Sequence, residues 1–349
     1  MIIAYAALFV LALIGAKISI KSFNTKEYLS MDSTNAVRGI FIMLVFLSHL
    51  MQYYTYTETI DVWGGKISKI LGQMIVVMFM FYSGYGIGES VKRKGSAYIK
   101  SFPTNRVLKT WLHFAAGVFV FFVLNLIIGK EYPVDRILLS FIGWENIGNS
   151  NWYIFAVIAL YIITWIAFTL FKNNKIAAAA VVTALTAAYV VVMYFVKEYW
   201  WYDTVLCYVA GLWYSLFKDK IESLLTKNNI IWAVIVVVLA LGWWHTHRRQ
   251  NLFVGLRILE ALMFALAFVA ASLKVSVKNK ALIWMGKYTF EIYILMRVPM
   301  IVFGKLGVKS FNLYIYVIVS LVATFVISFL FSKLLTQVDK LLFKPKKIK

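Results

Sequence analysis

Long apolar runs separated by short polar segments follow one another along almost the whole chain. A helix needs about 20 apolar residues to cross a hydrocarbon core of about 30 Å, and most of the runs come near that length. The runs lie at 1–16, 36–51, 71–91, 111–128, 151–171, 176–196, 201–217, 229–247, 257–273, 281–303 and 312–334. The pattern therefore predicts an all-α fold, a polytopic integral membrane helix bundle with about eleven transmembrane helices.

Two features of the runs predict local departures from this regular picture. The runs 1–16 and 36–51 are at the lower limit of length for crossing and need flanking residues. Of the prolines, only Pro299 lies inside a run, at 281–303. A proline removes one helical hydrogen bond and clashes with the preceding turn. We therefore expect the helix at 281–303 to kink or break.

Composition and charge agree with a membrane protein and orient it. Hydrophobic residues make up 62% of the chain, and the net charge is +21. Most of the 36 lysines and arginines lie in alternate connecting segments, as in cytoplasmic loops. This explains the charge better than nucleic-acid binding, and it predicts an outside N-terminus and a cytoplasmic C-terminus. The first run lacks the basic start and cleavage site of a signal peptide, so we expect a retained helix.

Neither a disulfide nor a metal centre is indicated. Cys207 is the single cysteine, which excludes an internal disulfide and a cysteine-based metal cluster. The histidines, His49, His113, His245 and His247, do not have the spacing of metal ligands.

Arg38 and His49 are the ionisable residues of the run 36–51, and they bracket the segment 39–48 within it. An offset of eleven residues turns a helix by about 1100°, roughly 20° past three full turns, so both residues share one face, about 16 Å apart along the axis. Each alone fits an interfacial arginine or a histidine satisfied by a neighbouring helix. The pair on one face favours a functional site. A neutral imidazole suits a general base, and a guanidinium suits a phosphate.

The stretch Arg38–His49 resembles the R-x10-H motif in the opening helix of the membrane acyltransferase family 3. Four further stretches resemble motifs of that family in the same order: 78–87, 98–109, 151–153 with Tyr161 after it, and 286–293. The resemblance covers roughly residues 31–335. Family members usually have ten core helices. The resemblance thus implies an acyltransferase domain at 31–349, preceded at 1–30 by an extra transmembrane helix and linker.

Some positions depart from the family pattern. Lys109 stands where the second arginine of an RxxR motif is usual, and a lysine lacks the planar fork. Met296 or Arg297 stands where a second histidine is common. The Trp-Ser-Leu-x-x-Glu form of the fourth family helix is absent.

The resemblance implies transfer of an acyl group, usually acetyl, from cytoplasmic acetyl-CoA or another acyl-CoA, across the cell membrane. The acceptor would be a hydroxyl of a surface polysaccharide or an exported molecule. His49 would act as general base or as acyl carrier. Arg38 would be the second catalytic residue. The segment 92–109, taken as a cytoplasmic loop, has six basic residues and no acidic one, which suits the phosphates of coenzyme A. The donor-binding residues would be Arg38, Arg106, Lys109 and Ser83.

Ser83 fits close helix packing at least as well as donor binding. Trp152 and Tyr153 are expected to form a wall of the acceptor site. Glu291 could orient His49 or an acceptor sugar, or pair with an arginine for structural reasons. Arg257 and Glu260, three residues apart, are expected to form a local salt bridge.

Two other classes of protein compete with an acyltransferase. A transporter or flippase for an anionic or glycolipid substrate could use the intramembrane charges as its path. Inverted repeats would favour it, and none is evident in the sequence. A structural assembly factor would leave the face of Arg38 and His49 unexplained. A cavity from the basic segment to His49 would favour the enzyme.

Overall fold

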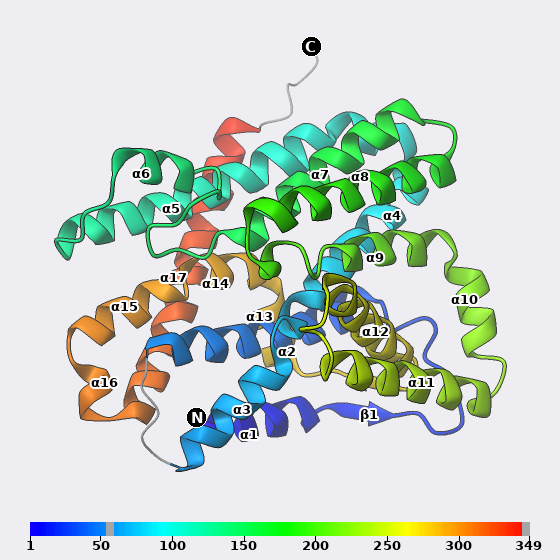
Figure 1. The fold of residues 1–349 in the computed structure, drawn as a ribbon, viewed down its shortest axis with the longest axis horizontal. Coiled ribbons are helices and arrows are strands. Elements are labelled where there is room, and N and C mark those ends of the chain that lie inside the picture. The colour runs from blue at the N-terminus through cyan, green and yellow to red at the C-terminus, as the bar shows by residue number, and fades with distance from the viewer. Residues whose placement is uncertain (54–58, 344–349) are drawn as a thin grey trace.

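The computed structural model describes residues 1–53 and 59–343, and these form a bundle of helices with α2 crossing its middle (Figure 1). The first half contains α1 Ile2–Leu13, β1 Ala16–Ile18, α2 Met31–Leu50, η1 Met51–Tyr53, α3 Thr59–Leu71, α4 Met74–Phe102, η2 Pro103–Leu108, α5 Lys109–Ile127, α6 Val134–Ser140, α7 Trp152–Leu170 and α8 Lys175–Val196. The second half contains η3 Tyr199–Trp201, α9 Leu206–Leu216, α10 Lys218–Leu225, α11 Asn229–His247, α12 Val254–Ser272, β2 Val275–Val277, α13 Lys280–Lys287, α14 Thr289–Leu295, α15 Arg297–Lys305, α16 Val308–Phe311 and α17 Leu313–Leu342.

Seven stretches of the described chain are long and apolar enough to cross a membrane. They are Met31–Tyr53, Val62–Ile127, Trp152–Leu170, Lys175–Val196, Asn229–His247, Val254–Ser272 and Leu313–Leu342. The second stretch has 66 residues, enough for more than one crossing at about 20 residues each. The chain is therefore an all-α, multi-helix membrane protein, as the apolar runs predicted.

Three of the eleven expected crossings are not single long helices. α1 has 12 residues and α9 has 11, so each is shorter than about 20 Å, against a hydrocarbon core of about 30 Å. The run 281–303 is divided into α13, α14 and α15. Pro299 lies in the first turn of α15, where its missing N–H leaves no helical bond unmade. The predicted break is confirmed, with α14 ending at Leu295, before the proline.

The segment 92–109 is helical, so its interpretation as a loop was wrong. α4 continues to Phe102, and the π-helix η2 leads without a gap into α5. Only Gly95, with a φ of 55°, interrupts the helical backbone of α4. Lysine, arginine and alanine favour a helix, and in this segment they outweigh the loop that charge alone suggested.

The closest helix crossings use glycines. A Cβ on Gly84 of α4 would meet the carbonyl of Tyr208 in α9, and a Cβ on Gly211 would meet the carbonyl of Phe81. A second crossing brings Gly39 of α2 against the backbone of Leu282 in α13. Small residues let helices approach closely in membranes. The crossings fix Arg38 and Ser83, which are neighbours of these glycines in sequence.

The strands β1 and β2 pair antiparallel and tie the segment after α1 to the segment after α12. The ammonium of Lys274 donates to the carbonyls of Ser19 and Ile20, at 3.1 and 2.8 Å. Both segments belong to the basic set of connections, so their pairing fits a location on one side of the membrane.

Replacing Gly84 with alanine should destabilise the protein, whereas the same change at Gly86 should not. Around Gly86 the described structure leaves at least 4 Å of space for a Cβ. Both substitutions gain the same helix propensity, about 1 kcal/mol. The difference between their free energies of unfolding therefore measures the crowding of a methyl group at position 84 against α9. Overpacking typically costs about 1–3 kcal/mol. Thermal unfolding of the purified variants would measure the effect, and equal midpoints would contradict the crossing described above.

Candidate functional site

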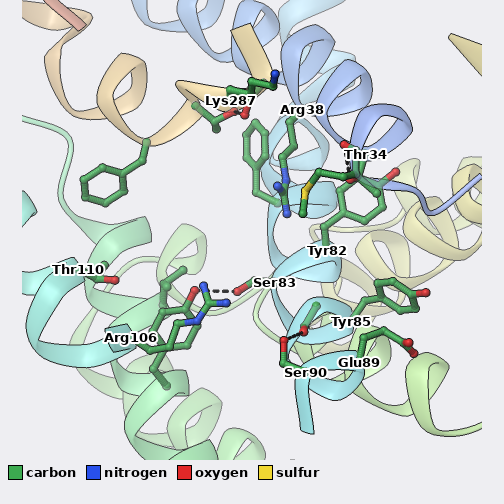
Figure 2. Close-up of a pocket in the computed structure, with 18 of the residues that line it drawn as sticks. Thr34, Arg38, Tyr82, Ser83, Tyr85, Glu89, Ser90, Arg106, Thr110 and Lys287 are labelled. Atoms are coloured by element: carbon green, nitrogen blue, oxygen red, sulfur yellow. Dashed lines mark hydrogen bonds between the residues drawn. The ribbon is translucent and has the colours of Figure 1, made fainter. Parts of the chain in front are cut away.

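A cavity of about 820 Å³ opens among α2, α4, η2, α7 and the segment α13–α14 (Figure 2). Its lining includes three of the four predicted donor-binding residues, namely Arg38, Ser83 and Arg106. Figure 2 shows Arg38 entering from α2 and Arg106 from the side of η2 and α5, with Ser83 of α4 near Arg106. Three residues far apart in the sequence, which the resemblance assigned to donor binding, therefore face one cavity.

The cavity is positively charged. Besides the two arginines, it is lined by Arg93, Lys94 and Lys287. Glu89 is the single acidic residue among the described residues of the lining. Its carboxylate already accepts hydrogen bonds from Lys92 at 2.7 Å and from Ser215 at 2.8 Å. The excess of basic groups suits a ligand with several negative charges.

Arg38 is held by uncharged groups. Its Nη1 donates to Oδ1 of Asn35 at 3.5 Å, and its guanidinium lies 5.7 Å from the centre of the Tyr82 ring. Among the described side chains, no carboxylate forms a salt bridge with it. Buried charges are normally paired with an opposite charge. The half-buried guanidinium of Arg38 has no carboxylate partner among the described residues, so it is available to an anionic ligand.

Arg106 and Ser83 each bond to a tyrosine. Nε of Arg106 donates to the hydroxyl of Tyr98 at 3.0 Å, and Oγ of Ser83 lies 3.0 Å from the hydroxyl of Tyr161. Both tyrosines line the cavity. π-Helical segments such as η2 occur frequently at functional sites. The Nη atoms of Arg106 form no salt bridge with a carboxylate among the described residues.

Lys109 lies in a neighbouring groove of about 450 Å³, which also contacts Arg106 and Lys94. Its ammonium forms a salt bridge with Asp339 of α17, and His113 bonds to the same carboxylate at 2.9 Å. The charge of Lys109 is thus already balanced. Of the two basic residues in this motif, Arg106 is better placed to bind a phosphate.

His49 lies on the same unbroken helix as Arg38, as predicted, but it does not line the cavity. Its Nδ1 accepts a hydrogen bond from Nη2 of Arg297 at 2.7 Å. Because an arginine can only donate, the proton of the neutral imidazole is on Nε2. Nη2 of Arg297 also donates to Gln52 at 2.7 Å.

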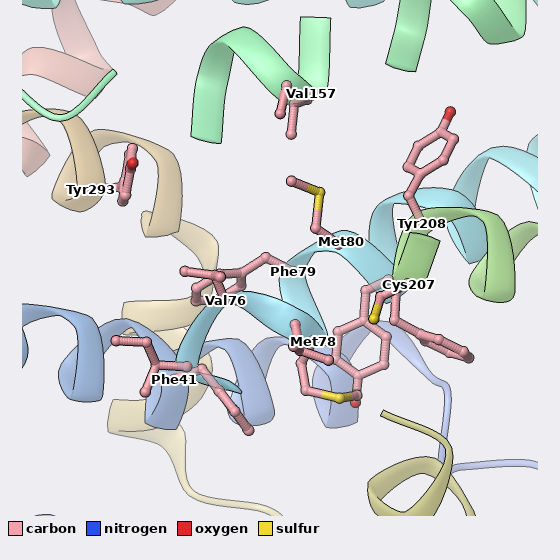
Figure 3. Close-up of a cluster of buried hydrophobic side chains, with 14 of the residues drawn as sticks. Phe41, Val76, Met78, Phe79, Met80, Val157, Cys207, Tyr208 and Tyr293 are labelled. Atoms are coloured by element: carbon pink, nitrogen blue, oxygen red, sulfur yellow. The ribbon is translucent and has the colours of Figure 1, made fainter. Parts of the chain in front are cut away.

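Three aromatic rings line the cavity at the end nearest to His49. Phe79 is the lining residue of α4 nearest to the start of that helix, and Arg38 is the lining residue of α2 nearest to His49. The ring of Tyr153 lies 6.2 Å from that of Phe79 and 5.4 Å from that of Tyr293. Figure 3 shows Phe79 and Tyr293 coming from α4 and α14 in the buried cluster. We call Phe79, Tyr153 and Tyr293 the aromatic wall.

The other candidate residues are distributed around this site. Tyr153 lines the cavity, while Trp152 packs against Tyr153 at 5.9 Å and does not line it. Glu291 lies near Ser332 and His113, on the side of α14 that faces α17 and α5. Its carboxylate is therefore not the group that contacts the ring nitrogens of His49.

The predicted salt bridge between Arg257 and Glu260 does not form in the structure, so this prediction was wrong. Glu260 instead accepts from His247 of α11 at 2.8 Å. Arg257 stacks on the Tyr199 ring at 4.0 Å and donates to Gln250 and Asn251. The loop after α11 folds back over the start of α12, so partners from outside the helix replace the local one.

The long apolar helices, together with a basic cavity inside the bundle, define a multi-pass membrane protein with an internal cavity. The family model of the acyltransferase domain, acyltransferase family 3, matches residues 31–333. The chain belongs to this family, and the resemblance seen in its motifs is confirmed. No curated protein and no solved structure matches the chain significantly.

Sequence reasoning missed the contact between Arg297 and His49, which are 248 positions apart. It noted Arg297 as an intramembrane charge at a position where the family commonly has a histidine, and this was the available signal. It expected Tyr153 to form a wall of the acceptor site but missed that Phe79 and Tyr293 join it, although both lie in the family-like stretches 78–87 and 286–293.

Proposed function

We propose that this acyltransferase is an O-acyltransferase that moves an acyl group, of acetyl type, from cytoplasmic acyl-CoA to a hydroxyl on an extracytoplasmic glycan or exported molecule. The observation that carries the proposal is the cavity in which Arg38 and Arg106 face a common space without carboxylate partners among the described residues. Its volume of about 820 Å³ lies near the upper end of the range for small-molecule sites, about 300–1,000 Å³.

In this proposal the phosphates of coenzyme A bind Arg106 and Arg38, and the thioester arm extends past Ser83 toward the aromatic wall. The acceptor hydroxyl attacks the thioester carbonyl, a C–O bond forms, and the C–S bond breaks. His49 takes the hydroxyl proton and returns it to the thiolate. In the other route, His49 first accepts the acyl group on a ring nitrogen and then passes it to the hydroxyl. The two routes use the same residues.

The donor site can be tested without knowledge of the acceptor. Purified protein in lipid nanodiscs should bind acetyl-CoA, and Arg106→Gln should weaken that binding at least tenfold, since a hydrogen bond to a charged group contributes about 1.5–3 kcal/mol. Lys100→Gln is the matched control, because Lys100 is exposed and lines neither the cavity nor the groove. Isothermal titration would measure the dissociation constants. A wild-type protein without affinity for acetyl-CoA would refute the donor assignment.

A further inference from the structure

Arg297, the first residue of α15, places against the C-terminal end of α2 a cation that the donor does not need. The guanidinium of Arg297 contacts His49, Gln52 and, at 3.4 Å, the hydroxyl of Tyr53, all of which are uncharged. Among the side chains that the structure describes, no carboxylate forms a salt bridge with it. A half-buried charge of this kind is expensive unless an anion accompanies it.

The surroundings of Arg297 hold further polar groups without partners. Its own Nε is buried and makes no hydrogen bond with the described residues. The hydroxyl of Tyr293, one turn earlier, lies beside the hydroxyl of Ser150, and neither has a further hydrogen-bond partner among the described residues. Unsatisfied buried donors lower stability, and a polar ligand at this place would satisfy them.

From these contacts we infer that the acceptor of the acyl group is an anionic molecule, and that Arg297 binds its carboxylate or phosphate next to His49. The inference rests on the proposed function, because it assigns the ligand of Arg297 to the acceptor. The donor phosphates belong to Arg38 and Arg106. Arg38 is about 16 Å from His49 along the axis of α2, so one donor phosphate cannot serve both Arg38 and Arg297.

The position of the hydrogen bonds on Arg297 gives the anion a second effect. A carboxylate binds a guanidinium most strongly through two parallel N–H groups. The edge formed by Nε and Nη2 offers such a pair, and Nη2 now donates to Nδ1 of His49. An anion on this edge competes for that proton. Acceptor binding therefore frees the Nδ1 lone pair, with which His49 takes the proton of the attacking hydroxyl.

The test uses two sugars that differ in one group, glucuronic acid and glucose. Titration of the protein in phosphatidylcholine nanodiscs should show glucuronic acid binding at least tenfold more tightly than glucose. Arg297→Gln should remove this preference, and Arg297→Lys should keep part of it, because the charge remains without the fork. Arg248→Gln is the matched control, since Arg248 is an exposed arginine at the end of α11.

Acetyl-CoA titrated into the same samples separates the possible failures. We expect its affinity to be unchanged in Arg297→Gln, because Arg297 does not line the cavity, and this also reports that the variant is folded. Equal affinity for the two sugars, with acetyl-CoA bound normally, would overturn the anionic acceptor and leave the donor site standing. The same result is expected if Arg297 only pairs with a lipid phosphate. A wild type that binds glucuronic acid but no acetyl-CoA would instead overturn the acyltransferase mechanism.

Discussion

Replacing His49 with alanine is expected to lower the rate of acyl transfer by a factor of about 10² to 10⁴, the usual contribution of a positioned general acid–base group. Binding of acetyl-CoA should be preserved, because His49 does not line the cavity that contains Arg38 and Arg106. The measurement is incorporation of label from radioactive acetyl-CoA into the glycan fraction of membranes that contain the protein. Titration of the purified variant gives the affinity for the donor.

Two further substitutions make this prediction specific. His49→Gln keeps a side-chain acceptor for Arg297, so it should restore activity if His49 only supports the packing of α2. If His49 moves a proton or carries the acyl group, the glutamine variant should remain as inactive as the alanine variant. His245→Ala is the matched control, because His245 is exposed and bonds to Arg249 in the turn that follows α11. Full transfer activity in His49→Ala would refute the mechanism.

Labelled protein can also distinguish the two routes through His49. An acyl-imidazole intermediate would leave label on the wild-type chain after rapid quenching, and none on His49→Gln. A general base leaves the chain unlabelled at every time point.

The sequence predicted those features of the site that lie within one element. Arg38 and His49 fall on one helix because apolar residues fill the interval between them, and the structure has α2 unbroken from Met31 to Leu50. Pro299 predicted a break for a reason that lies in its own ring. Chemistry that depends on one helix or one residue can be read from local sequence.

Features that depend on where helices end were predicted less well. The run 201–217 is mostly apolar, but Trp201 ends the 3₁₀-helix η3, residues 202–205 form a buried turn, and α9 begins only at Leu206. Hydropathy records the burial of a segment and not its backbone conformation, so a buried turn and a helix give the same signal. The basic segment 92–109 shows the reverse case, since its charge suggested a loop and its backbone is helical.

Features that join distant helices could not be predicted from a single sequence. The contact of Gly84 with α9 requires both the spacing on α4 and the packing of a helix more than 100 residues later. The contact of Arg297 with His49 depends in addition on the break before α15, which sets the direction of the arginine. The charge balance of each arginine therefore became visible only in three dimensions, and it is this balance that separates Arg38, Arg106 and Arg297 from Lys109.

The second large effect is expected at Arg38. Arg38→Ala should weaken the binding of acetyl-CoA by about 100-fold, which corresponds to about 2.8 kcal/mol, since each tenfold change is about 1.4 kcal/mol. The reason is that the guanidinium enters the cavity with Asn35 and the Tyr82 ring as partners and with no carboxylate among the described residues. Arg38→Lys should recover part of the affinity, because an ammonium supplies charge without the planar fork. Isothermal titration measures both, with Arg248→Gln as the control.

Acetyl-CoA that lacks its 3′-phosphate can show which phosphate each arginine binds. Arg106 lies on the side of the cavity that joins the basic groove at Lys94 and Lys109, so it should bind the 3′-phosphate of the nucleotide. Arg106→Gln should then weaken binding of acetyl-CoA but not of its 3′-dephospho form. Arg38 lies deeper, near the aromatic wall, and Arg38→Ala should weaken both ligands equally because it contacts the diphosphate or the arm beyond it. If Arg38→Ala changed neither dissociation constant, Arg38 would not bind the donor, and the donor would have to enter this bundle by another path. The distance from Arg38 to His49 along α2 would then say nothing about how the thioester reaches His49.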